Sequence, residues 1–114
     1  WKIGLQAPRT EAGKFLTTLN VENQALATSG DYMQAFSDDL MSHHIIDPRS
    51  GYSSPELASV SVLAPSVMLA DGLATSAMVM GKSGLDLIEK MSGCEAIAVT
   101  KKSAVLKTSG FREI

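Results

Sequence analysis

A proline followed by a serine, Pro65-Ser66, divides the most apolar part of the chain into two segments. Residues 58–63 mix apolar and small polar side chains over a length typical of a β-strand. Residues 66–80 point apolar side chains in almost every direction of a helix, and Gly81 ends that pattern. We therefore expect a helix that is buried on most of its faces, which requires other elements to pack around it.

Five other segments have the length and the mixed apolar and polar character of strands, and turn-forming residues separate them. They are residues 1–6, 16–21, 24–28, 96–101 and 104–108. A second, amphipathic helix is expected from about 84 to 91. These elements predict one α+β unit in which an antiparallel sheet packs with a buried helix, and residues 101–103 close the last hairpin.

Charge and composition exclude several classes of protein. Ten Lys and Arg against twelve Asp and Glu give a net charge of −2 over 114 residues, so we expect no nucleic-acid partner. The single cysteine, Cys94, has no partner for an internal disulfide or a Cys-rich metal site and is expected in the core. The apolar runs are far shorter than the roughly 18–20 residues that span a bilayer.

The first candidate for chemistry lies in the apolar helix, where Asp71 and Thr75 are four residues apart and project from the same face. A carboxylate and a hydroxyl are oxygen ligands of the kind that Mg²⁺ accepts. Alternatively, Asp71 complements the helix dipole or caps backbone N–H groups, and Thr75 bonds back to a carbonyl. The spacing alone favours this second interpretation.

The second candidate is the segment 42–51, in which two histidines, an aspartate and an arginine fall around a Pro–Gly turn. If residues 43–46 are extended, His43 and His44 face opposite sides, so at most one of them belongs to a given site. A histidine here could move a proton or bind phosphate, and Arg49 could contact an anion. Alternatively, Asp47 and Arg49 pair locally and the histidines are merely hydrogen-bonded. The local sequence does not choose.

The third candidate, residues 27–32, is a segment of small residues after a strand. Its composition predicts a turn, because it lacks the glycine spacing and the lysine of a phosphate-binding loop.

Several motifs occur together in one order and spacing. They are W-K-I-G at 1–4, A-T-S-G-D-Y at 27–32, H-I-I-D-P-R-S-G at 44–51, S-V-S-V-L-A-P at 59–65 and A-D-G-L-A-T at 70–75. In these motifs, and over essentially its whole length, the chain resembles the FAD:protein FMN transferases, the ApbE-like flavin transferase family. The resemblance implies a T-fold-related domain, of which residues 1–114 form the C-terminal segment and the N-terminal half is absent.

The resemblance also implies an enzyme that uses Mg²⁺ and FAD. Such an enzyme transfers FMN through a phosphoester bond to a threonine of an acceptor protein and releases AMP, while some relatives hydrolyse FAD to FMN and AMP instead. It assigns Asp71 and Thr75 to the metal, which reverses the interpretation that spacing alone favours. It assigns His44 to proton transfer or phosphate contact beside the flavin, and Ile45 to contact with FAD through its backbone or side chain.

Further expectations follow from the same resemblance. Asp47, Arg49 and Gly51 would form the turn that fixes His44. The missing N-terminal half would supply much of the FAD pocket and a further metal ligand, so the chain alone is expected to have little or no transferase activity. The family is commonly exported, which suggests the bacterial periplasm or the outer face of the inner membrane, with any anchor outside this chain. The sequence leaves a homodimer through uncovered strand edges open.

Three interpretations remain. The chain is either a catalytic segment of a flavin transferase, or a non-catalytic flavin-binding or interaction module that has kept the fold. A structural domain in which Asp71 is only a helix-start acid is the third reading. We expect a buried Asp71 to disfavour the non-catalytic readings, because a buried carboxylate without a cation is costly.

Overall fold

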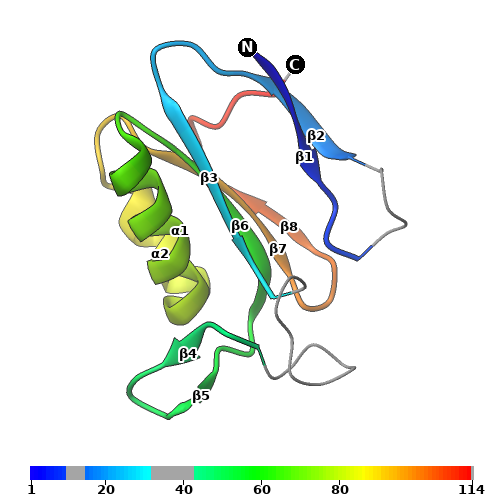
Figure 1. Ribbon diagram of the computed structural model, residues 1–114, viewed down its shortest axis with the longest axis vertical. Helices are drawn as coiled ribbons and strands as arrows, with labels where there is room; N and C mark the ends of the chain where they lie inside the picture. The colour runs from blue at the N-terminus through cyan, green and yellow to red at the C-terminus, as the bar shows by residue number, and fades with distance from the viewer. Residues whose placement is uncertain (10–14, 32–42, 114) are drawn as a thin grey trace.

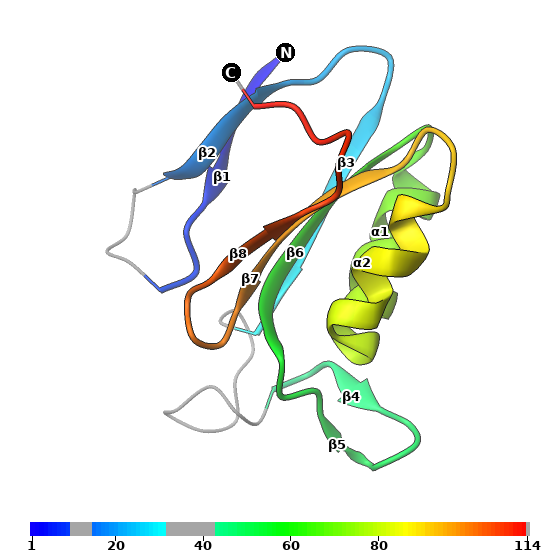
Figure 2. The ribbon, with the colours of Figure 1, turned by 180° about the vertical axis from the view of Figure 1, so that it is seen from behind.

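The computed structural model describes residues 1–9, 15–31 and 43–113 and shows an α+β fold (Figure 1). A four-stranded antiparallel sheet in the order β3-β6-β7-β8 forms its centre. These strands are β3 (Ala25–Gly30), β6 (Leu57–Ala64), β7 (Glu95–Thr100) and β8 (Val105–Lys107). Helices α1 (Val67–Met80) and α2 (Lys82–Glu89) lie on one side of this sheet, as the view from behind also shows (Figure 2).

A separate antiparallel hairpin packs on the other side of the sheet. It consists of β1 (Lys2–Gln6) and β2 (Phe15–Asn20), whose Leu5 and Leu19 are buried against Leu63 of β6 and Ile97 of β7. A very short hairpin, β4 (Ile46–Asp47) and β5 (Tyr52–Ser53), lies below one end of α1 (Figure 1). The central sheet is therefore covered on both faces.

Strand β6 occupies the middle of the molecule, and all eight of its residues are buried. Its alternating side chains divide between two cores, because successive residues of a strand point to opposite faces. Val60 and Val62 face the helices, whereas Leu63 faces the β1–β2 hairpin. A strand buried on both faces reads as a continuous run of apolar and small residues, as residues 57–64 do.

Helix α1 begins and ends as its sequence predicts. The Ser66 hydroxyl caps the first turn by accepting a hydrogen bond from the Leu69 N–H at 3.2 Å. Gly81 ends the helix with φ of +71°, a conformation that favours glycine. Helix α2 follows at once and crosses closely, since a Cβ placed on Gly84 would lie 2.6 Å from the Cα of Ala77.

The predicted α+β fold, the six predicted strands and both helices are confirmed, with three differences. Strand β3 continues to Gly30, where a turn is predicted from the small residues, because its register with β6 extends to Ser59. Helix α2 covers 82–89 rather than 84–91. The β4–β5 hairpin is not predicted at all. None of the helices in the described part of the chain has the length and apolar character needed to cross a membrane.

Candidate functional site

Helix α1 has one buried face and one exposed face. The buried face packs on the sheet and on α2 and consists of Ala70, Leu73, Ala74, Ala77 and Met78. Asp71 and Thr75 lie on the opposite face, and both are exposed. The prediction that this helix is buried on most faces is wrong, because α1 lies on the outside of the described fold and only its inner side is covered. Val67 and Met68 are consequently 66% and 84% exposed.

Strand β3 meets this exposed face at the Thr75 hydroxyl. The Ser29 Oγ lies 3.1 Å from the Thr75 Oγ1, and either hydroxyl can donate the hydrogen bond. Ser29 belongs to the A-T-S-G-D-Y motif, whose last residue, Tyr32, lies outside the described residues. Two of the three candidate segments of the sequence are therefore in direct contact.

A groove runs from this point toward the β4–β5 hairpin. Its lining comes from the outer face of α1 and from the residue that follows β4, and consists of Pro48, Gly72, Thr75, Ser76, Val79 and Met80. Pro48 belongs to the second candidate segment, residues 42–51. The fold thus brings parts of all three segments to one side of the molecule, although they lie far apart in the sequence.

The hydrogen bonds of the β4–β5 turn are made within the turn itself. The Asp47 carboxylate accepts bonds from the Arg49 backbone N–H at 2.9 Å and from its guanidinium at 2.9 and 3.1 Å. The Asp47 carbonyl accepts the Gly51 N–H at 2.8 Å, and Gly51 has φ of +76°. The hydrogen bonds from Arg49 lower the pKa of Asp47. The local pairing that the sequence left open is present.

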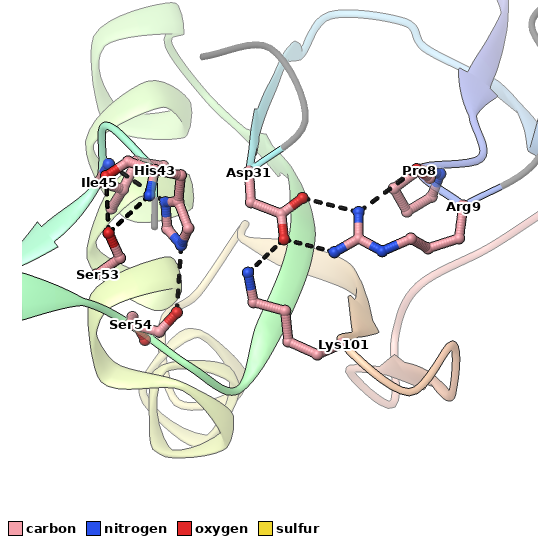
Figure 3. Close-up of polar contacts among 8 residues, drawn as sticks. All are labelled: Pro8, Arg9, Asp31, His43, Ile45, Ser53, Ser54 and Lys101. Atoms are coloured by element: carbon pink, nitrogen blue, oxygen red, sulfur yellow. Dashed lines mark hydrogen bonds and ion pairs between the residues drawn. The ribbon is translucent and has the colours of Figure 1, made fainter. Parts of the chain in front are cut away.

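The two adjacent histidines have opposite surroundings. His43 is fully buried, and both of its ring nitrogens are hydrogen-bonded (Figure 3). Its Nδ1 accepts the Ile45 N–H at 3.3 Å, so its Nε2 carries the proton and donates to the Ser54 carbonyl at 3.2 Å. Burial lowers the pKa of His43. His44 is exposed, so it is the histidine that can reach a ligand.

Ile45, the other residue assigned to FAD by the resemblance, lies in the hydrophobic core. Its side chain is 6% exposed and packs in the cluster between the sheet and the helices. Together with the bonds that His43 makes to Ser53 and Ser54, this anchors the chain directly before β4. His44 therefore projects from a segment that is fixed on both sides.

A buried ion cluster lies at the end of β3 and was not found from the sequence. Asp31 is fully buried and accepts two hydrogen bonds from the Arg9 guanidinium, at 2.9 and 2.6 Å, and one from Lys101 (Figure 3). Burial by itself raises the pKa of Asp31, but the bonds from Arg9 and Lys101 outweigh it and lower the pKa. Arg9 and Lys101 lie 22 and 70 residues from Asp31 in the sequence, so no local pattern predicts these contacts.

The metal ligands assigned by the resemblance provide oxygen donors only. Among the residues that the structure describes, no three His, Cys, Asp or Glu side chains gather as a metal-binding group. Asp71 and Thr75 would thus supply two oxygens on an exposed surface. Such a pair fits Mg²⁺, which is commonly held by one or two carboxylates while water and phosphate oxygens fill the other positions. It does not fit zinc, which prefers nitrogen and sulfur.

Comparison with known proteins decides the family. The family model described as the ApbE family matches residues 1–98. The chain belongs to the ApbE family. A FAD:protein FMN transferase of Vibrio cholerae is 36% identical over 115 residues, and one of Treponema pallidum is 31% identical over 114 residues. These alignments cover 99% and 97% of this chain but 33% and 32% of the relatives.

Solved structures of ApbE proteins have the same fold. The ApbE protein of Thermotoga maritima superimposes with a TM-score of 0.83 at 31% identity, over 96% of this chain and 36% of that one. The flavinyl transferase ApbE of Pseudomonas stutzeri gives a TM-score of 0.70 at 31% identity, over 96% of this chain and 32% of that one. The chain therefore spans about a third of the length of the relatives that it matches.

Proposed function

We propose that this chain forms the metal-binding part of an Mg²⁺-dependent FAD:protein FMN transferase. The complete enzyme would move FMN from FAD to a threonine of an acceptor protein and release AMP. One observation carries this proposal: in a chain of the ApbE family, Asp71 and Thr75 share the exposed face of α1, beside Ser29 and the groove that reaches Pro48. An Asp71 paired with a lysine or arginine of the chain itself would have argued against it.

Asp71 and Thr75 would hold Mg²⁺ through one carboxylate oxygen and one hydroxyl oxygen. Bound there, the metal would supply charge neutralisation for the pyrophosphate of FAD while the bond to the AMP phosphate breaks. In the described part of the chain, Asp71 makes no hydrogen bond or ion pair, so its oxygens are available to a cation. Helix α1 holds the two side chains one turn apart because its other face is packed in the core.

His44 would act at the reacting phosphate or at the hydroxyl of the acceptor threonine, by moving a proton or by contacting phosphate. Its exposure next to the buried His43 supports this role. Ile45 would contact FAD through its backbone, since its side chain packs in the core. The Asp47–Arg49 turn and Gly51 would keep this segment in place.

The remaining parts of the proposal concern what lies outside the chain. It would be the C-terminal segment of its domain, and the rest of the domain would complete the FAD pocket. Because the chain spans about a third of its relatives, we expect little or no transfer by the chain alone. The acceptor protein would meet the complete enzyme in the bacterial periplasm or at the outer face of the inner membrane, as the resemblance implies.

The experiment uses the complete protein and measures FAD binding by flavin fluorescence with and without Mg²⁺, and FMN transfer to an acceptor by intact-mass analysis. Wild type should show Mg²⁺-dependent binding and an FMN adduct on a threonine. Asp71→Asn should lose both while remaining folded, and Asp86→Asn, the same change at an exposed position of α2, should lose neither. Free FMN without an adduct would instead indicate FAD hydrolysis. Metal-independent FAD binding in both variants would indicate a non-catalytic module.

A further inference from the structure

We propose that Ser29 is a positioning residue for Thr75. Its hydroxyl would accept a hydrogen bond from the Thr75 hydroxyl and thereby turn the lone pairs of Thr75 toward the cation. This inference rests on the proposed function and deepens it, because it adds to the two expected ligands a residue from another element of the fold.

The two hydroxyl groups meet because of the strand alternation in β3. Ala25 and Ala27 pack in the core that contains the helices, whereas Leu26 packs in the core under the β1–β2 hairpin. Ser29 continues the first series and faces α1. Its Oγ lies 3.1 Å from the Thr75 Oγ1, although the residues are 46 positions apart in the sequence.

Strand β3 holds Ser29 rigidly. Ser29 pairs with Val60 in the β3–β6 register, and the Asp31 N–H still donates to the Ala58 carbonyl at 2.9 Å beyond the strand end. The Asp31 carboxylate is fixed in turn by Arg9 and Lys101. A side chain on such an anchored strand can hold a neighbouring hydroxyl in one orientation.

The neighbouring residue of α1 shows what a helix hydroxyl does without such a partner. Ser76 donates to the Gly72 carbonyl of the preceding turn at 2.7 Å. Thr75 has the equivalent acceptor in the Asp71 carbonyl but is bonded to Ser29 instead. Ser29 therefore draws the Thr75 side chain toward β3 and away from the default bond.

The direction of the hydrogen bond follows from the chemistry of a cation site. A hydroxyl has one proton and two lone pairs. When its oxygen binds a cation, the proton must point away from the ion, and the cation makes the O–H group a stronger donor. Ser29 lies at the distance of an acceptor for that proton. Residues that orient metal ligands in this way typically change metal affinity by 10- to 100-fold when they are removed.

The test measures Mn²⁺ binding to the complete protein by electron paramagnetic resonance, with Mn²⁺ alone as the probe for Mg²⁺. Ser29→Ala should weaken the affinity about 10-fold, and Ser29→Thr, which keeps the hydroxyl, should restore it. Thr28→Ala is the matched control. It removes a hydroxyl from the adjacent residue of β3, which bonds to Ser61 at 2.7 Å and should leave the affinity unchanged.

A second measurement reports orientation without metal. Three-bond NMR couplings should show one Thr75 χ1 rotamer in the wild type and in Ser29→Thr, and averaging among rotamers in Ser29→Ala. A merely structural role of Ser29 would not produce this rotamer change in a chain whose amide spectrum is otherwise preserved.

The outcomes separate the two proposals. If Asp71→Asn loses Mn²⁺ and Ser29→Ala keeps wild-type affinity, the positioning role is wrong and the metal site stands. If the complete wild-type protein takes up no Mn²⁺, or if Asp71→Asn and Thr75→Ala bind it as the wild type does, both proposals are wrong.

Discussion

Asp31 directly follows strand β3, and Asp71 lies on the exposed face of helix α1. The proposed site uses both elements, yet the surroundings of the two aspartates are opposite. Asp31 is fully buried and bonded to Arg9 and Lys101. Asp71 is exposed and, in the described part of the chain, makes no ion pair. A buried carboxylate needs compensating charge to exist in the fold, whereas an exposed one needs none and can take a ligand.

The two aspartates differ in the source of the positive charge that compensates the carboxylate. The cations that satisfy Asp31 belong to the chain itself. The cation expected for Asp71 would come from outside. Asp71 is exposed rather than buried as expected, so the cost of burying a carboxylate does not speak against a non-catalytic module.

The largest expected effect is that of Asp31→Asn on stability. This change removes the carboxylate charge that Arg9 and Lys101 share, and breaking a buried pair costs about 3 kcal/mol or more. We expect the low end, because the Arg9 side chain is 23% exposed. Urea denaturation measures the free energy of unfolding. Asp71→Asn should change it by less than about 0.5 kcal/mol, as surface substitutions do. Equal losses in both variants would remove the distinction between the two aspartates.

A milder change at the same cluster should have a smaller effect. Arg9→Lys keeps the positive charge but loses the two-pronged contact with Asp31, so we expect a loss of about 1 kcal/mol in the free energy of unfolding. Arg49→Lys is the control, because its pairing with Asp47 is exposed and should contribute little. If Arg9→Lys is as harmful as Asp31→Asn, the geometry of the guanidinium rather than charge compensation dominates the cluster.

The smallest effect concerns the histidines, which repeat the comparison in adjacent residues. Burial is the main cause that lowers the pKa of His43 from 6.5. Lys101 and His44 add to the lowering, while the bond to Ser54 and the charge of Asp31 oppose it. The unfolded chain therefore takes up a proton near pH 6.5 that the folded chain resists. Stability contributed by neutral His43 should be complete above pH 6.5 and fall as the pH drops toward the lower pKa of the folded state.

Unfolding in urea from pH 7.5 to pH 5 measures this dependence, whose slope cannot exceed about 1.4 kcal/mol per pH unit for one proton. His43→Gln should flatten the slope, and His44→Gln, at the exposed position, should leave it as it is. If His44→Gln flattens the slope and His43→Gln does not, then His43 is not the source of the pH dependence.

Much of the fold could be predicted from local patterns. The break at Pro65-Ser66 and the glycine at 81 mark the ends of α1, and both signals act within a few residues. The short β4–β5 hairpin escaped prediction because each of its strands has two residues, too few for a periodic pattern. The outward face of α1 was misjudged because it also carries the apolar residues Val67, Met68 and Met80, which local sequence cannot assign to the core or to the surface.

The candidate site divides in the same way. The motifs at 44–51 and 70–75 identified His44, Ile45, Asp71 and Thr75 for the proposed site. The expected alternation of an extended segment predicted that at most one of the two histidines belongs to a given site. The fold decided which one, because it buries His43 and exposes His44. Ser29 escaped notice because its partner is 46 residues away, and serine in a small-residue segment reads as a turn.

By itself, the sequence determined the α+β class, the ends of helix α1 and, through its motifs, membership of the ApbE family. These properties depend on neighbours within a few residues or on the order of motifs. Only the tertiary structure decided which aspartate is compensated, which histidine is buried and which hydroxyl meets Thr75. Each of these depends on groups brought together by sheet register and helix packing, and that proximity has no trace in the local sequence.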